Sequence, residues 1–74
     1  MSEQVLGDRV KGTVLWFDAP KGYGFVLYNE VQHFIHYTQI RMEDYRAVDA
    51  GDLVSFVPCV GPRGPYCSDL EVVS

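Results

Sequence analysis

Apolar residues at helical spacing never persist for three turns in this chain, and glycine or proline interrupts it repeatedly. Short runs rich in β-branched and aromatic residues, which are typical of strands, recur along the chain instead. Five of them are predicted to be strands: residues 9–18, 23–28, 31–37, 53–60 and 66–73. Short turns join them, except for the long connection 38–52, which has room for one short helical turn. The sequence therefore predicts an all-β fold.

The order of the connections favours a small closed barrel. The first three predicted strands follow one another through tight turns, as in an antiparallel meander. A long connection then carries the chain to the fourth strand, as a Greek-key barrel requires, and closure removes the exposed sheet edges that promote aggregation. We therefore predict a five-stranded antiparallel Greek-key barrel over residues 10–74, preceded by an N-terminal extension of residues 1–9.

Composition limits the partners of such a domain. The net charge of -4 argues against binding that is driven mainly by phosphate contacts. Residues 1–41 are neutral overall, whereas residues 42–74 carry two basic and six acidic side chains. There is no apolar run long enough for a membrane helix, and the first residues lack the features of a signal peptide. We expect a cytoplasmic protein in which Cys59 and Cys67 are thiols.

The segment KGYGFVLYNEVQHFIHY, residues 21–37, contains five aromatic residues and two histidines. Strand alternation places Tyr23 and Phe25 on one face of the second predicted strand, and Phe34 and His36 on one face of the third. If these strands pair through the tight turn between them, the four side chains form one contiguous patch.

Trp16 of the first predicted strand can join this patch. The opposite face then fills the barrel with aliphatic side chains, namely Val14, Val26, Ile35 and Val54. The alternative is that the aromatic residues form the core and the aliphatic residues face solvent. Lys21 and Gly22 favour the first arrangement, because a cation and a flexible backbone at the edge of the patch suit a ligand that bears phosphate.

The same segments resemble the cold-shock domain family, small barrels of the OB type that bind single-stranded nucleic acid. KGYGFV is similar to the family's first nucleic-acid-binding motif and HFIHYT to its second. Downstream, AGDLVSF and GPRGPYCSDL are similar to its fourth strand, its glycine–proline hairpin and its last strand. The resemblance covers roughly residues 10–73.

The resemblance implies a binding surface made of aromatic residues and two cations. Carried over position by position, the stacking residues are Trp16, Phe17, Tyr23, Phe25, Phe34, His36, Tyr37 and, in the long connection, Tyr45. Lys21 matches a lysine at the edge of this set, and Arg63 lies in the hairpin that approaches the strand. Each unpaired base stacked on an aromatic side chain gains ~1–3 kcal/mol with little regard to sequence. The expected ligand is single-stranded RNA or DNA, with pyrimidine-rich strands tolerated, and the expected role is that of a nucleic-acid chaperone or a modulator of transcription or translation.

Several positions differ from the family pattern. Leu15 stands where a lysine is usual, the hairpin after Tyr28 is shortened, and His33 replaces an inward valine. We expect His33 to be a partly buried imidazole near the barrel end. Because cations are lost and aromatic residues are kept, binding should depend on stacking more than on counterion release.

A second hypothesis is that the acidic residues between 43 and 71 dock on a protein partner, so that the chain acts as a regulator or a mimic. Neither a metal site, a cofactor nor an enzyme is expected. His33 and His36 are three residues apart on a strand and point to opposite faces, while Cys59 and Cys67 lack C-x-x-C spacing. Residues that would form an activated nucleophile do not stand out either. A disulfide between the two cysteines is conceivable across a hairpin, but a reducing cytosol disfavours it.

Overall fold

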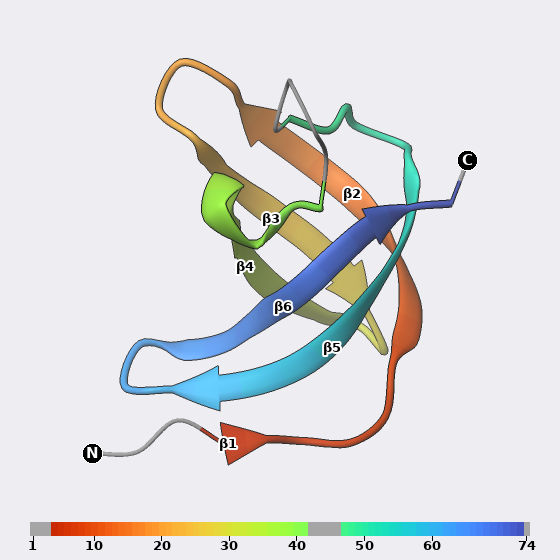
Figure 1. Cartoon of the computed structure of the whole chain (residues 1–74), viewed down its shortest axis with the longest axis vertical. Coiled ribbons are helices and arrows are strands. Elements are labelled where there is room, and N and C mark those ends of the chain that lie inside the picture. The colour runs from red at the N-terminus through yellow and green to blue at the C-terminus, as the bar shows by residue number, and fades with distance from the viewer. Residues whose placement is uncertain (1–3, 42–46, 74) are drawn as a thin grey trace.

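The computed structural model describes residues 4–41 and 47–73 as strands joined by turns, with one 3-10 turn (Figure 1). The strands are β1 (Gln4–Val5), β2 (Val10–Asp18), β3 (Tyr23–Tyr28), β4 (Val31–His36), β5 (Leu53–Gly61) and β6 (Gly64–Val72), and the 3-10 turn η1 spans Tyr37–Gln39. The all-β prediction is confirmed, and the five predicted strands correspond to β2–β6 with ends that differ by at most two residues. In the part of the chain that is described, there is no helix long and apolar enough to cross a membrane.

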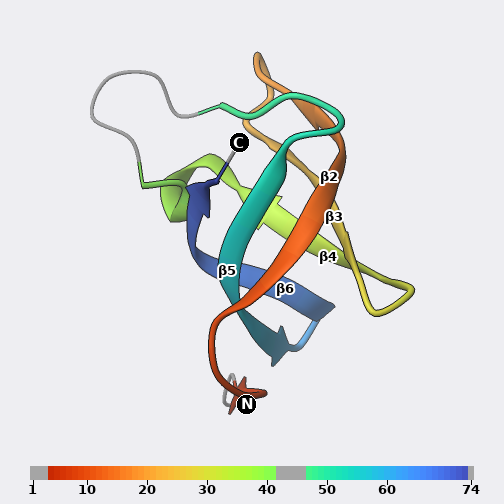
Figure 2. The same cartoon turned by 90° about the vertical axis from the view of Figure 1, so that its right-hand side faces the viewer.

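The strands form one sheet that closes on itself. The order is β1-β5-β2-β3-β4-β6, and β5 also pairs with β6, so that β2–β6 form the predicted barrel (Figures 1 and 2). Neighbouring strands are antiparallel except β4 and β6, which pair in parallel at Phe34 and Tyr66. The extension adds the short strand β1 to the edge of the sheet, where Val5 lies opposite Cys59 of β5. This extra strand was not predicted from the sequence.

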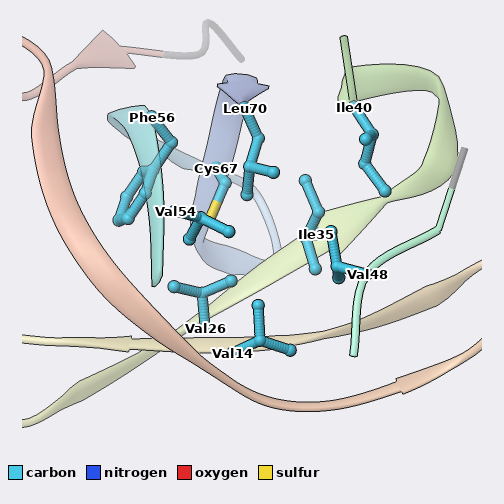
Figure 3. Packing of buried hydrophobic residues seen from close by; sticks show 9 residues of the cluster. All are labelled: Val14, Val26, Ile35, Ile40, Val48, Val54, Phe56, Cys67 and Leu70. Carbon is cyan, nitrogen blue, oxygen red and sulfur yellow. The ribbon is translucent and has the colours of Figure 1, made fainter. Parts of the chain in front are cut away.

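The interior of the barrel holds aliphatic side chains, one phenylalanine and the thiol of Cys67 (Figure 3). The four aliphatic residues predicted to face inward are confirmed, since each is at most 1% exposed: Val14, Val26, Ile35 and Val54. Phe56 and Leu70 are completely buried beside them. The alternative arrangement, in which the aromatic patch forms the core, is therefore wrong.

A β-bulge in β2 explains how an aliphatic and an aromatic residue two positions apart face opposite ways. In a regular strand, Val14 and Trp16 would lie on the same face. The register between β2 and β3 shifts between these two residues: Val14 lies opposite Val26, whereas Trp16 lies opposite Phe25. The extra residue reverses the alternation, as bulges do. Val14 is consequently 1% exposed, while Trp16 is 42% exposed.

His33 is more deeply buried than expected, with 4% of its surface exposed. Its ring packs against Tyr28 and Phe56, with centroid distances of 5.8 and 5.6 Å. Its Nδ1 lies 3.0 Å from the carbonyl oxygen of Val31. Because a carbonyl can only accept, Nδ1 carries the proton and donates it to this oxygen. His33 thus supports the hairpin from the inside of the barrel and takes no part in the outer surface.

Candidate nucleic-acid interface

Six ring-bearing side chains form a continuous row on the outer face of β2, β3 and β4 and the start of η1. The row consists of Trp16, Tyr23, Phe25, Phe34, His36 and Tyr37. Neighbouring ring centroids lie 4.7 to 6.5 Å apart. These distances are typical of edge-to-face and offset-stacked aromatic pairs. We call this set the aromatic row.

The pairing of the strands sets the order of the aromatic row. Trp16 of β2 lies opposite Phe25 of β3, which lies opposite Phe34 of β4, and Tyr23 lies opposite His36. Directly opposed residues on one face of an antiparallel pair are close enough for their side chains to touch. The row is therefore a consequence of register, and a slip by one residue would turn these rings toward the core.

A two-residue turn fixes the register of the β3–β4 hairpin. Tyr28 lies opposite Val31, so only Asn29 and Glu30 connect the strands. Both have positive φ, 54° and 63°, as a type I′ turn requires. This short turn is the trimmed hairpin noted in the sequence, and its geometry suits the right-handed twist of the two strands.

Two glycines of the KGYGF segment allow the backbone to approach the aromatic row closely. Gly22 has φ +82°, and a Cβ there would lie 2.7 Å from Cδ1 of Tyr37. The carbonyl of Gly22 also accepts a hydrogen bond from the amide of Tyr37, at 2.8 Å. A Cβ at Gly24 would lie 2.1 Å from the carbonyl oxygen of Trp16. A side chain at either position would push β3 or Tyr37 away from the row.

Two of the predicted stacking residues are not part of the aromatic row as the structure describes it. Phe17 follows the bulge, lies opposite the buried Gly24 and packs partly against the core. Its side chain is half-buried and makes no ring contact with the aromatic row within the described residues, so its stacking role, which the family resemblance implied, stays a prediction. Tyr45 lies outside the described residues.

The two predicted cations lie in turns. Lys21 is exposed in the turn between β2 and β3, where its amide donates to Oδ1 of Asp18 at 3.2 Å. Arg63 is exposed in the β5–β6 hairpin. Within residues 4–41 and 47–73, neither side chain forms an ion pair. Their charges are therefore not neutralised by a described carboxylate.

A groove of about 720 Å³ lies between the aromatic row and the β5–β6 hairpin. Phe25, Phe34 and His36 line one side, and Arg63 and Tyr66 belong to the other. The groove was not predicted from the sequence, and neither were three further residues that line it: Tyr66, Gln32 and Gln39. The parallel pairing of Phe34 with Tyr66 brings β4 and β6 together. Because these strands are distant in the sequence, no local pattern indicated this contact.

Part of the excess of acidic residues is neutralised within the chain. Arg9 lies 2.6 Å from Asp69, and Arg41 lies 3.2 Å from Asp69 and 2.9 Å from Glu71. Arg9 also donates to the carbonyl and the hydroxyl of Ser55. Such half-exposed ion pairs contribute little stability, about 0–1 kcal/mol each. They do, however, reduce the negative field that a polyanion would meet around Asp69 and Glu71.

The two cysteines are free thiols inside the protein. Burial, and secondarily the neighbouring Cys59, raise the pKa of the Cys67 thiol far above its ordinary value. A thiol held in this way is a poor nucleophile, because the reactive form is the thiolate. Within the described ranges, no three His, Cys, Asp or Glu side chains are grouped so that they could hold a metal ion.

Comparison with known proteins agrees with this geometry. The family model of the 'Cold-shock' DNA-binding domain matches residues 10–73. A cold shock-like protein of Thermotoga maritima is 37% identical over 65 residues, which cover 86% of this chain and 98% of that protein. The cold shock protein CspA of Staphylococcus saprophyticus is 38% identical over 61 residues, or 81% of this chain and 92% of the relative. The cold shock-like protein CspA of Bordetella pertussis is 33% identical over 64 residues, or 84% and 96%. The chain belongs to the cold-shock domain family, a family of domains that bind nucleic acid.

Proposed function

We propose that this protein binds single-stranded RNA or DNA by stacking unpaired bases on the aromatic row. The observation that carries the proposal is the continuity of the row. Its six rings lie on an outer face of the sheet, and each ring centroid is within 6.5 Å of a neighbouring one. Trp16 and Tyr37, near its two ends, are 42% and 43% exposed. A row that served only to support the barrel would not need its large rings outside, since aliphatic residues already fill the interior.

Stacking supplies most of the affinity in this proposal. Base stacking on aromatic side chains is worth ~1–3 kcal/mol per base and tolerates any base, because every base has a π-face. The proposed phosphate contacts come from Lys21 and Arg63 at the edges of the surface. With so few cations, the affinity should respond only weakly to salt, and the sequence preference should be modest.

This mode of binding suits a nucleic-acid chaperone or a modulator of transcription or translation. A base that is stacked on the protein cannot pair at the same time. Binding would therefore shift the equilibrium of a strand toward its unpaired state, by an amount that grows with the fraction of strands bound. We place this activity in the cytoplasm, where a binder of unpaired RNA or DNA meets its ligand.

A titration tests the proposal. Short oligopyrimidines are added to the protein and the fluorescence of Trp16 is followed. We expect saturable quenching, because a base stacked on the indole changes its environment. The same strand annealed to its complement is the control, since its bases are already stacked and should quench far less. Equal quenching by the duplex, or none by either ligand, would refute stacking on this surface.

The alternative function, docking of a protein partner on the acidic residues between 43 and 71, has weaker support. Asp69 and Glu71 are held in ion pairs with Arg9 and Arg41, so their carboxylates are already occupied. Asp52 accepts a hydrogen bond from the backbone amide of Asp49. A basic partner would have to displace or share these contacts.

A further inference from the structure

Gln39 lies in the groove beside the aromatic row, although no sequence pattern indicated a role for it. It is the last residue of η1, the turn that directly follows β4 and therefore Phe34 and His36. All three side chains line the same groove. Gln39 is thus placed where a strand that stacks on the row would continue toward the β5–β6 hairpin.

The orientation of the Gln39 amide is fixed by the bulge in β6. The backbone amide of Asp69 donates to Oε1 of Gln39 at 3.2 Å, and the hydroxyl of Ser68 lies 3.3 Å from the same oxygen. A backbone N–H can only donate, so the atom that faces it must be the carbonyl oxygen and not the NH2 group. The NH2 group therefore occupies the other side of the amide plane.

This NH2 group is open to solvent. Among residues 4–41 and 47–73, no acceptor forms a hydrogen bond with Nε2 of Gln39. The same part of the chain has no buried side-chain nitrogen or oxygen without a partner. Nε2 is consequently accessible, and it offers two N–H donors on a side chain that lines the groove.

His36 presents a donor by the same logic. Its Nδ1 accepts from the backbone amide of Thr38 at 3.4 Å, and the hydroxyl of Thr38 lies 2.8 Å away. Since Nδ1 accepts, the proton of the neutral ring is on Nε2. Arg63, also in the groove, has donors only. The groove therefore offers donors from three side chains, and a matching ligand supplies acceptors.

We propose that Gln39 is a specificity-determining residue that donates from Nε2 to an acceptor oxygen of the bound single strand, either a base carbonyl or a phosphate oxygen. The inference rests on the proposed function and adds a polar contact to the stacking surface. A single strand carries phosphate oxygens throughout and a carbonyl oxygen on every base except adenine, whereas stacking on the row uses neither. The contact at Gln39 would thus hold the strand in one orientation along the groove.

Three variants test this contact. Gln39→Glu keeps an oxygen for the amide of Asp69 and replaces only the NH2 donor. Gln39→Met removes the donor without adding charge. Gln32→Glu is the matched control, because Gln32 is exposed in the same groove and receives the same charge. The affinities for short oligothymidine and oligodeoxyadenosine strands are measured by Trp16 quenching, and the melting temperature of each variant is recorded.

We expect Gln39→Met to bind oligothymidine about three- to tenfold more weakly than the unchanged protein, the effect of one lost hydrogen bond. Gln39→Glu should lose at least as much, and clearly more than Gln32→Glu. A loss with oligothymidine alone assigns the acceptor to a base carbonyl, because adenine has none. An equal loss with both strands assigns it to phosphate.

Two results would overturn the inference. One is a Gln39→Met variant that is folded and binds both strands as tightly as the unchanged protein. The other is an equal loss in Gln39→Glu and Gln32→Glu, which shows that charge alone matters. If Gln39→Met does not fold, the comparison of the two glutamate variants decides. Failure of the proposed function is distinct, because the unchanged protein would then bind neither strand.

Discussion

Phe34 is the position where the stability and the binding activity of this domain can be separated most clearly. It lies in the middle of the aromatic row, with ring centroids of Tyr23, Phe25 and His36 at 5.9, 5.8 and 6.5 Å. It is half-buried, whereas Phe56 in the core is completely buried. The Phe34→Ala variant therefore removes a large ring from the surface without opening a cavity in the barrel.

The expected loss of stability is modest and the expected loss of affinity is large. Truncation of a fully buried phenylalanine costs ~3–5 kcal/mol. Phe34 loses contacts on one side only, so we expect about a third of this, roughly 1–1.7 kcal/mol in the free energy of unfolding. Loss of one stacked base should cost ~1–3 kcal/mol of binding free energy, which is about a five- to hundredfold weaker affinity.

The assay measures both quantities on the same samples, and Phe56→Ala is the matched control. Urea or thermal unfolding gives the stability, and quenching of Trp16 by oligothymidine gives the affinity. Phe56→Ala makes the same truncation in the core, where it should remove most of a total stability of order 5 kcal/mol. The stacking mechanism is refuted if Phe34→Ala unfolds as readily as Phe56→Ala, or if it stays folded and binds with unchanged affinity.

Three further predictions address the turn, the salt response and the alternative function. Glu30→Gly should stabilise the protein by about 0.5–1 kcal/mol in urea unfolding, because glycine adopts the positive φ of the type I′ turn without strain; a loss of stability would contradict this account. The logarithm of the affinity for oligothymidine should fall with the logarithm of salt concentration with a slope of roughly −1.4, or about −0.7 for each phosphate contact of Lys21 and Arg63. A slope steeper than about −3 would mean that cations outside this pair dominate binding. Reversal of charge at Asp44 and Asp49 should leave oligonucleotide binding intact or strengthen it, and loss of a captured protein partner in a pull-down would favour the docking hypothesis instead.

The sequence was sufficient to predict the strands of the barrel and most of the aromatic row because both depend on local alternation. Strands β3 and β4 are regular and joined by a two-residue turn, so the parity of Phe25 and Phe34 follows directly from their positions. In β2 the same rule fails. Val14 and Trp16 share a parity, and only the bulge between them turns one inward and the other outward. Phe17, which the family resemblance assigned to the binding surface, packs partly against the core beyond the bulge, and its role in binding stays a prediction.

The polar side of the groove could not be predicted, because it depends on how the barrel closes. Phe34 and Tyr66 meet through the single parallel contact of β4 with β6, and no short segment encodes that contact. Gln39 acquires its orientation from a second nonlocal feature, a bulge in β6 at which Asp69 has φ +55°. An aspartate tolerates this conformation better than most residues, yet a lone aspartate in a strand is no signal of a bulge. Four of the six rings of the aromatic row lie in the β3–β4 hairpin and depend on its register, whereas the donor at Gln39 keeps its orientation only if the closure of β4 on β6 and the bulge in β6 are kept. A relative that retained the row but lost the β6 bulge should still stack bases, with no orienting contact from the position of Gln39.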